Sequence, residues 1–171
     1  MAYKNICALI LGCSFVDFTY TKYAKKKYAF LNSGASLAIE QIANFYKKSE
    51  IPIFLVVDNE DKNFEFKAFS NCNFIKVPKT KSIFETLKIA ILEIGKIHFD
   101  NIIINPIQVI PTENLKNNSI SLSKSSLRKG RWTAIDLDSK EINFLYRDDS
   151  SADGKLSYAF TGRINVKISH L

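Results

Sequence analysis

The sequence predicts an α/β fold whose sheet is mixed but mainly parallel and is followed by a C-terminal antiparallel hairpin. Three apolar runs, 6–11, 53–57 and 101–105, are typical of strands buried on both faces, and helical patterns lie between them. Strands that alternate with helices usually form a parallel sheet. From residue 131 the pattern changes to period two, which indicates antiparallel strands.

Length and composition are those of a single domain over residues 1–171. Hydrophobic residues make up 46% of the chain and charged residues 24%, so a sizeable core can form. We divide the domain into an α/β half, 1–111, and a β-rich half, 112–171. No apolar run approaches the roughly 20 residues that span a bilayer. The first run is also too short for a secretory leader, so we expect a cytoplasmic protein.

The net charge of +7 and the isoelectric point near 9.3 favour anionic partners such as nucleotides, sugar phosphates or nucleic acid. Basic residues gather only at 22–27 and 124–131, and elsewhere they are typical of a solvated surface. Because no RNA-binding motif or recognition helix can be identified, we do not expect a nucleic-acid partner. Cys7, Cys13 and Cys72 lack metal-ligand spacing, which argues against zinc.

The first half begins with the strand at Ile6–Leu11, which ends at Gly12. A helix is predicted to begin at Ser36 and to close with two lysines, 47 and 48, which complement its C-terminal dipole. Its core stripe comprises Leu37, Ala38, Ile42, Phe45 and Tyr46. After Pro52 a buried strand, 53–57, is predicted to end at Asp58.

The next segment is expected to hold a short helix at 64–69 and a strand at 73–77. A clear helix follows, because Ser82 and Glu85 match a capping box with Ser82 as N-cap. Its apolar stripe comprises Ile83, Leu87, Ala90, Ile91 and Ile94. The pattern fades near Gly95, before the strand at 101–105.

The β-rich half begins with a polar, serine-rich run, 119–126, which we interpret as a connection. Two alternating segments, 133–137 and 142–146, are predicted to form a hairpin with its turn at 138–140. The final apolar segment, 164–168, reads as an edge strand.

Small and basic residues suggest a phosphate site at one edge of this sheet. The first strand delivers Gly12 to a hydroxyl-rich loop, and lysines cluster at 22–27. Ligands of such sheets bind at the carboxyl ends of the strands. Those ends carry Gly12, Asp58, 78–82 and 105–108. We therefore expect a nucleotide site there.

The segments 8–12 and 27–37 resemble the sugar-phosphate nucleotidyltransferases, also called nucleoside-diphosphate-sugar pyrophosphorylases. Ala-Leu-Ile-Leu-Gly is similar to the family's first strand, and Lys27 to Leu37 is similar to its Lys-x-Leu-hydrophobic-x-x-x-Gly-x-Pro-Leu segment. The resemblance implies a Rossmann-like, three-layer fold of the GT-A type. It also implies transfer of a nucleotidyl group from a nucleoside triphosphate to a phosphorylated sugar or small metabolite, with Mg²⁺ and release of pyrophosphate.

The resemblance also assigns roles to single residues. Lys27 would be catalytic, as the lysine that contacts the phosphates. Nucleotide contacts fall on Leu11, Gly12, Cys13, Ser14, Lys81 and Ser82. Substrate contacts fall on Gln108, Arg147 and Gly162. Structural interpretations stay open beside these, such as a turn for Gly12, a helix cap for Ser82 and an exposed hairpin charge for Arg147.

Three departures from the family pattern leave two functions open. The loop after Gly12 lacks the second Gly and the Arg of Gly-x-Gly-Thr/Ser-Arg, and Gln108 stands where a metal-binding Asp is expected. The chain also stops soon after Gly162, before the family's second metal Asp. The first function is an enzyme of surface polysaccharide precursor synthesis that uses Mg²⁺. The second is an inactive module that binds a nucleotide, a sugar or a protein partner, and a homo-oligomer or partner domain fits either.

Overall fold

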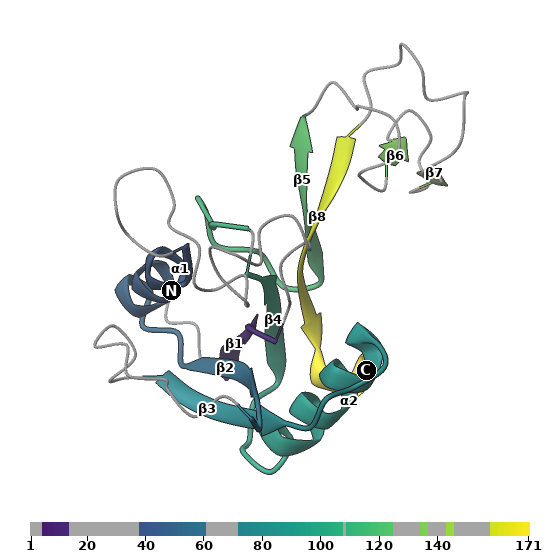
Figure 1. Cartoon of the computed structure of the whole chain (residues 1–171). Helices are drawn as coiled ribbons and strands as arrows, with labels where there is room; N and C mark the ends of the chain where they lie inside the picture. The colour runs from purple at the N-terminus through teal and green to yellow at the C-terminus, as the bar shows by residue number, and fades with distance from the viewer. Residues whose placement is uncertain are drawn as a thin grey trace.

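The computed structural model describes residues 5–13, 38–60, 72–107, 109–124, 134–136, 143–145 and 158–171. Within these ranges eight strands form one mixed sheet (Figure 1). Seven of them follow the order β3-β2-β1-β4-β8-β6-β7, and β5 pairs with β8 off this path. The predicted fold class, with a parallel half and a C-terminal antiparallel hairpin, is therefore confirmed.

Four parallel strands form the first half of the sheet. They are β1 (Ile6–Leu11), β2 (Ile53–Asp58), β3 (Cys72–Val77) and β4 (Asn101–Pro106), close to the ranges that the sequence predicts. β1 lies between β2 and β4, with Leu11 opposite Val56 on one side and Pro106 on the other. The carboxyl ends of the four strands therefore meet at one edge.

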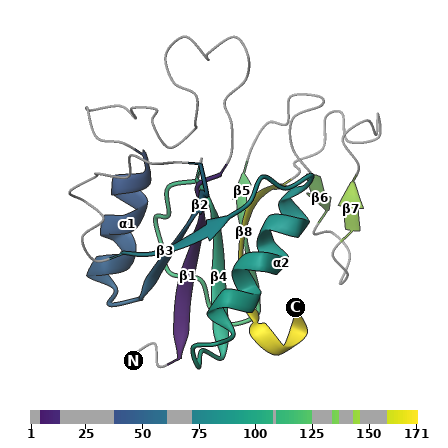
Figure 2. The same cartoon turned by 60° about the horizontal axis from the view of Figure 1, so that its bottom comes forward.

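Two helices cover opposite faces of these strands and complete three layers (Figure 2). Helix α1 (Ala38–Lys48) packs Ile42 and Tyr46 against the face that carries Ile10. Helix α2 (Ile83–Ile94) packs on the face that carries Leu9. Since successive side chains of a strand point to opposite faces, an unbroken apolar strand needs both helices.

The capping prediction for α2 is confirmed, but one residue of its predicted stripe is exposed. The Glu85 amide donates to Ser82 Oγ over 3.2 Å, and the Glu85 carboxylate accepts from the Lys81 amide. The buried residues are Thr86, Ala90 and Ile94, whereas Ile83 is 53% exposed. Ile83 lies in the first turn, at the rim of a cavity, and therefore has less of the sheet to cover.

The antiparallel half contains β5 (Ser119–Lys124), β6 (Ala134–Asp136), β7 (Asn143–Leu145) and β8 (Tyr158–Lys167), and a 3-10 turn, Ile168–His170, follows. The predicted hairpin is confirmed, because β6 pairs antiparallel with β7. The predicted serine-rich connection is wrong, since β5 occupies most of it. Its serines alternate with Ile120 and Leu122, and pairing with β8 satisfies its backbone.

The predicted edge strand at 164–168 is also wrong. It belongs to the ten-residue strand β8, which lies inside the sheet between β4 and the antiparallel strands. Gly162 lies within this strand at φ +81°, where the β5–β8 register shifts. A bulge with a glycine at positive φ lets one strand continue past an apparent turn signal.

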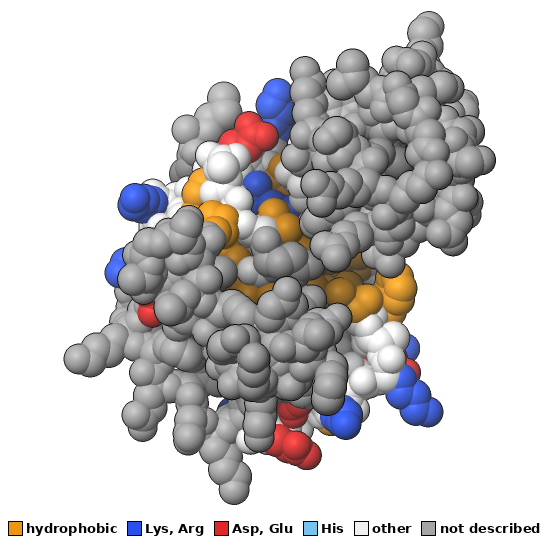
Figure 3. Space-filling view, turned by 45° about the horizontal axis from the view of Figure 1, so that its top comes forward, with side chains coloured by type: hydrophobic (Ala, Val, Ile, Leu, Met, Phe, Trp, Pro, Cys, Tyr) orange, Lys and Arg blue, Asp and Glu red, His pale blue; other side chains and the backbone are white. Residues whose placement is uncertain are grey.

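Among the side chains that Figure 3 colours on this face, apolar ones lie in the middle with a basic one among them, and other basic side chains lie at the margin. In the part of the chain that the structure describes, no helix is long and apolar enough to cross a membrane. The predicted short helix at 64–69 lies outside the described residues, as do Ser14, Lys27, Gln108 and Arg147.

Candidate functional site

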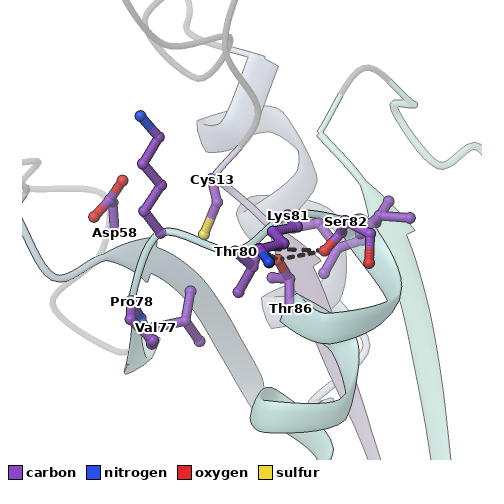
Figure 4. A pocket seen from close by; sticks show the side chains of 11 residues that line it. Cys13, Asp58, Val77, Pro78, Thr80, Lys81, Ser82 and Thr86 are labelled. Atoms are coloured by element: carbon purple, nitrogen blue, oxygen red, sulfur yellow. Dashed lines mark hydrogen bonds between the residues drawn. The ribbon is translucent and has the colours of Figure 1, made fainter.

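A cavity of about 380 Å³ opens at the carboxyl ends of β1, β2 and β3 (Figure 4). It brings together four residues that the sequence predicts to bind the nucleotide: Leu11, Cys13, Lys81 and Ser82. The other lining residues are Asp58, Val77, Pro78, Lys79, Thr80, Ile83 and Thr86. In Figure 4, Cys13 lies between Asp58 on one side and Thr80 on the other.

The wall formed by 78–82 is held in place by hydroxyl groups of α2 and its cap. The Thr80 and Thr86 hydroxyls are hydrogen-bonded to one another, and both lie within hydrogen-bonding distance of the Ser82 carbonyl, at 3.2 and 3.3 Å. One hydroxyl therefore donates to the other, and the second donates to the carbonyl. Ser82 itself caps the helix, so its side chain has a structural function whatever else it contacts. Thr86 is a site residue that sequence reasoning missed, because its position on an apolar helix face suggested only packing.

Among the described residues, two cations and one carboxylate line the cavity. Lys79 and Lys81 stand at the start of α2, whose N-terminus carries a partial positive charge. Asp58 is 7% exposed, and its Oδ1 accepts the Glu60 amide over 3.1 Å, which shapes the turn after β2. The balance of charge favours an anionic or hydrogen-bonding ligand such as a nucleotide.

Gly12 has a packing reason to be glycine. Its amide donates to the Val56 carbonyl over 2.9 Å, and a Cβ at this position would lie 2.7 Å from the same oxygen. The close approach of β1 to β2 therefore excludes any side chain. The role of Gly12 toward a phosphate stays a prediction, and its amide is already hydrogen-bonded.

A second polar group lies between the end of β4 and the middle of β8. Gly162, a predicted substrate contact, lies against Pro106, since an added Cβ would be 3.0 Å from Pro106 Cγ. The Tyr46 hydroxyl donates to Asn105 Oδ1 over 2.7 Å and accepts from Arg163 Nε over 3.2 Å. Burial raises the pKa of Tyr46, and the Arg163 guanidinium opposes that shift. These residues belong to the α1 side of the sheet, whereas Leu11 and Val77 at the cavity belong to the α2 side.

Sequence reasoning missed Arg163, although a signal exists. Arg163 and Asn165 alternate with Ile164 and Val166, so one face of β8 is polar and the other apolar. Both polar residues are nearly fully buried. Because the residues of this strand alternate between polar and apolar, its polar side chains all lie on one face of the sheet. That pattern could have indicated that they need hydrogen-bond partners on that face.

Several solved structures share this arrangement of strands and helices. A nucleoside-diphosphate-sugar pyrophosphorylase from Vibrio cholerae is 14% identical with a TM-score of 0.68, and the match covers 94% of this chain and 72% of that one. The chain has the nucleotidyltransferase fold. No protein-family model matches the sequence, and no curated protein matches it.

Two further nucleotidyltransferase structures give the same result. The CTP:phosphocholine cytidylyltransferase of Streptococcus pneumoniae is 15% identical with a TM-score of 0.66, over 93% of this chain and 69% of that one. The inositol-1-phosphate CTP transferase of T. maritima is 13% identical with a TM-score of 0.63, and the match covers 96% of this chain and 71% of that one. The Rossmann-like, three-layer class predicted from the resemblance is therefore confirmed.

The described residues offer a Mg²⁺ ion few ligands, since Asp58 is the one carboxylate among them that lines the cavity. They contain no group of three or more His, Cys, Asp or Glu side chains that could hold a metal. At the end of β4, Asn105 has its amide nitrogen on the Pro106 and Val109 carbonyls and its oxygen on Tyr46. A neutral amide with all its atoms engaged is a poor substitute for a carboxylate ligand.

Proposed function

We propose that this chain binds a nucleoside triphosphate in the cavity and transfers its nucleotidyl group to a sugar phosphate or a similar phosphorylated metabolite. One observation carries the proposal: the cavity lies at the carboxyl ends of β1–β3 and at the start of α2, on a nucleotidyltransferase fold. The ligands of open α/β sheets bind at such an edge. The structures with this fold named above are enzymes of nucleotidyl transfer.

In this reaction an oxygen of the acceptor phosphate attacks the α-phosphorus in line. A new P–O bond forms, and the bond to the β,γ-diphosphate breaks with release of pyrophosphate. Catalysis of this kind depends on positioning and on neutralising charge. Lys79, Lys81 and the α2 N-terminus supply positive charge at the cavity, and we assign the same function to Lys27.

We place the reaction in the cytoplasm, in the synthesis of surface polysaccharide precursors. Ser14 is proposed as a further nucleotide contact, and Gln108 and Arg147 as acceptor contacts, as the resemblance implies. Because the described residues offer Mg²⁺ only the Asp58 carboxylate at the cavity, no step here depends on the ion.

A second candidate is a module that binds a nucleotide or a sugar without catalysis. The engaged amide of Asn105 favours it, because the end of β4 then offers no carboxylate. The departures from the family loop after Gly12 point the same way.

Thermal-shift titrations of the full chain with CTP, UTP, ATP and GTP, with and without Mg²⁺, test nucleotide binding. Thr86→Val keeps the shape of the side chain but removes the hydroxyl that holds Thr80, so we expect about tenfold weaker binding if that hydroxyl contributes about 1.4 kcal/mol. Lys88→Ala is the control, since Lys88 is an exposed lysine of α2 that does not line the cavity.

Pyrophosphate release from a panel of sugar phosphates then separates the two candidates. Release that is lost in Lys27→Ala supports the enzyme. Nucleotide binding without release from any acceptor supports the binding module. No shift with any nucleotide would refute the enzyme and the nucleotide-binding module, and would leave only a module that binds a sugar or a protein partner.

A further inference from the structure

Arg163 is a charged side chain in the interior of the protein. It is 2% exposed, and its guanidinium carbon lies 5.7 Å from the centroid of the Phe45 ring and 5.8 Å from that of Tyr46. Its Nε donates to the Tyr46 hydroxyl, but its Nη2 is buried without any hydrogen-bond partner. Among the described residues, no Asp or Glu forms a salt bridge with it.

The neighbouring polar groups are satisfied, which makes Nη2 an exception. Asn105 donates to two carbonyls, and Asn165 donates to the Leu115 carbonyl over 3.1 Å while it accepts from Asn101. No other buried side-chain nitrogen or oxygen of the described residues lacks a partner. A buried cation costs several kcal/mol where no counter-charge offsets it, and the described residues supply none to this guanidinium.

The position of Arg163 links it to the candidate site. It follows Gly162 and lies beside the end of β4, because Ile164 pairs with Ile104 and Gly162 lies against Pro106. Pro106 in turn pairs with Leu11, which lines the cavity. Arg163 therefore lies at the same end of the sheet as the cavity, on a strand two away from β1. Its side chain is on the face that α1 covers, whereas Leu11 and Val77 of the cavity are on the face that α2 covers.

We propose that Arg163 is the specificity-determining residue of an anion subsite at the same end of the sheet as the cavity, on the α1 face, where Nη2 binds an oxygen of a phosphate or carboxylate group on the acceptor. The rings of Phe45 and Tyr46 hold the planar guanidinium in one orientation, and the Nε bond to Tyr46 fixes its rotation. An oxyanion then forms a charge-assisted hydrogen bond with Nη2 and neutralises the buried charge. The identity of the ligand as an acceptor rests on the proposed function.

The guanidinium is closed off from solvent in this structure, so an anion reaches it only when its surroundings open locally. Binding then releases the cost of the uncompensated charge. We therefore expect anions to stabilise the protein and to bind slowly.

The test is a thermal-shift titration of the full chain with inorganic phosphate and with acetate, at constant ionic strength set by chloride. Wild type is compared with Arg163→Met, which keeps the length of the side chain but removes the charge, and with Arg163→Lys, which keeps the charge but not the planar fork. We expect phosphate or acetate to raise the melting temperature of wild type. Arg163→Met should melt higher than wild type without anion and lose the anion shift, and Arg163→Lys should bind at least about tenfold more weakly, a loss of about 1.4 kcal/mol. Whichever of phosphate and acetate binds more tightly shows whether the acceptor group is a phosphate or a carboxylate.

A wild type without any anion shift overturns the proposal, and so does a folded Arg163→Met that keeps the shift. If Arg163→Met does not fold, the anion affinity of Arg163→Lys is the test instead. An affinity equal to that of wild type overturns the proposal. Lys81→Ala distinguishes the proposed subsite from the cavity, because the anion should still raise the melting temperature of this variant. If the anion no longer stabilises Lys81→Ala but still stabilises Arg163→Met, it binds in the cavity and the proposal is overturned. The nucleotide titration of Arg163→Met should equal that of wild type, so a failure of the anion subsite and a failure of the proposed function are read separately.

Discussion

The Tyr46 hydroxyl donates to Asn105 Oδ1 over 2.7 Å, and this bond joins α1 to the carboxyl end of β4. Both side chains are fully buried. The same hydroxyl accepts from Arg163 Nε, so a single oxygen connects a helix and two strands that meet beside the candidate site. The position of α1 on the sheet therefore depends on a polar contact as well as on the apolar core.

Tyr46→Phe should lower the free energy of unfolding by about 2 kcal/mol, because it leaves Asn105 Oδ1 and Arg163 Nε buried without this partner. Urea unfolding followed by circular dichroism measures the change. The control is Ser49→Ala, which removes a half-buried hydroxyl at the end of the same helix, bonded to the Phe45 carbonyl and to Asn114. Equal losses in the two variants would contradict a special function for the Tyr46 hydroxyl.

Gly162→Ala should destabilise the protein by more than about 1 kcal/mol. Its φ of +81° is unfavourable for alanine, and the new methyl group would lie 3.0 Å from Pro106 Cγ. Gly95→Ala is the matched control, since Gly95 ends α2 with a helical φ of −60°. Thermal unfolding of both variants decides, and a melting temperature of Gly162→Ala at or above that of Gly95→Ala would refute the strained conformation.

The strands and the α2 cap could be predicted because their signals are local. Ile6–Leu11 is apolar throughout, and Ser82 with Glu85 forms a helix start within one turn. The errors arise where partners are distant in the sequence. The serines of 119–124 become a strand only through pairing with β8, about 40 residues away. The bond between Tyr46 and Arg163 spans 117 positions, so no local pattern could reveal it.

The candidate site could likewise be predicted in part from the sequence. Leu11, Cys13, Lys81 and Ser82 were expected together because the family resemblance implies nucleotide contacts there, and they share the cavity. Thr86 and Arg163 were missed because each looks like an ordinary member of a helix or strand in sequence. Their importance follows from what they contact, which only the packed structure shows.

Alkaline pH should destabilise the protein through Cys7. This thiol is fully buried, and burial raises its pKa from 9.0 to about 12. Above pH 9 the unfolded chain releases the proton while the folded chain keeps it, so the free energy of unfolding falls by about 1.4 kcal/mol per pH unit until the folded thiol ionises. The stabilisation is fully present below pH 9. Urea unfolding measured between pH 8 and pH 11 should show that the free energy of unfolding falls less steeply with pH in Cys7→Ala than in wild type. Equal dependence on pH in the two proteins would contradict the raised pKa of Cys7.

Alkylation of Cys13 offers a direct measure of cavity occupancy. Cys13 is half-buried and lines the cavity, whereas Cys72 is half-buried at the start of β3, away from that edge. Cys7 is buried and stays protonated, so it should not react in the folded protein.

Because a ligand in the cavity covers the Cys13 thiol, a nucleotide at ten times its dissociation constant should slow alkylation of Cys13 about tenfold. Cys72 serves as the internal control, since its rate should not change. Iodoacetamide labelling at pH 8, followed by mass spectrometry of the tryptic peptides, gives both rates in one sample. Equal slowing at Cys13 and Cys72 would indicate general stabilisation rather than occupancy. A nucleotide that stabilises the protein but leaves Cys13 as reactive as before would show that it binds elsewhere.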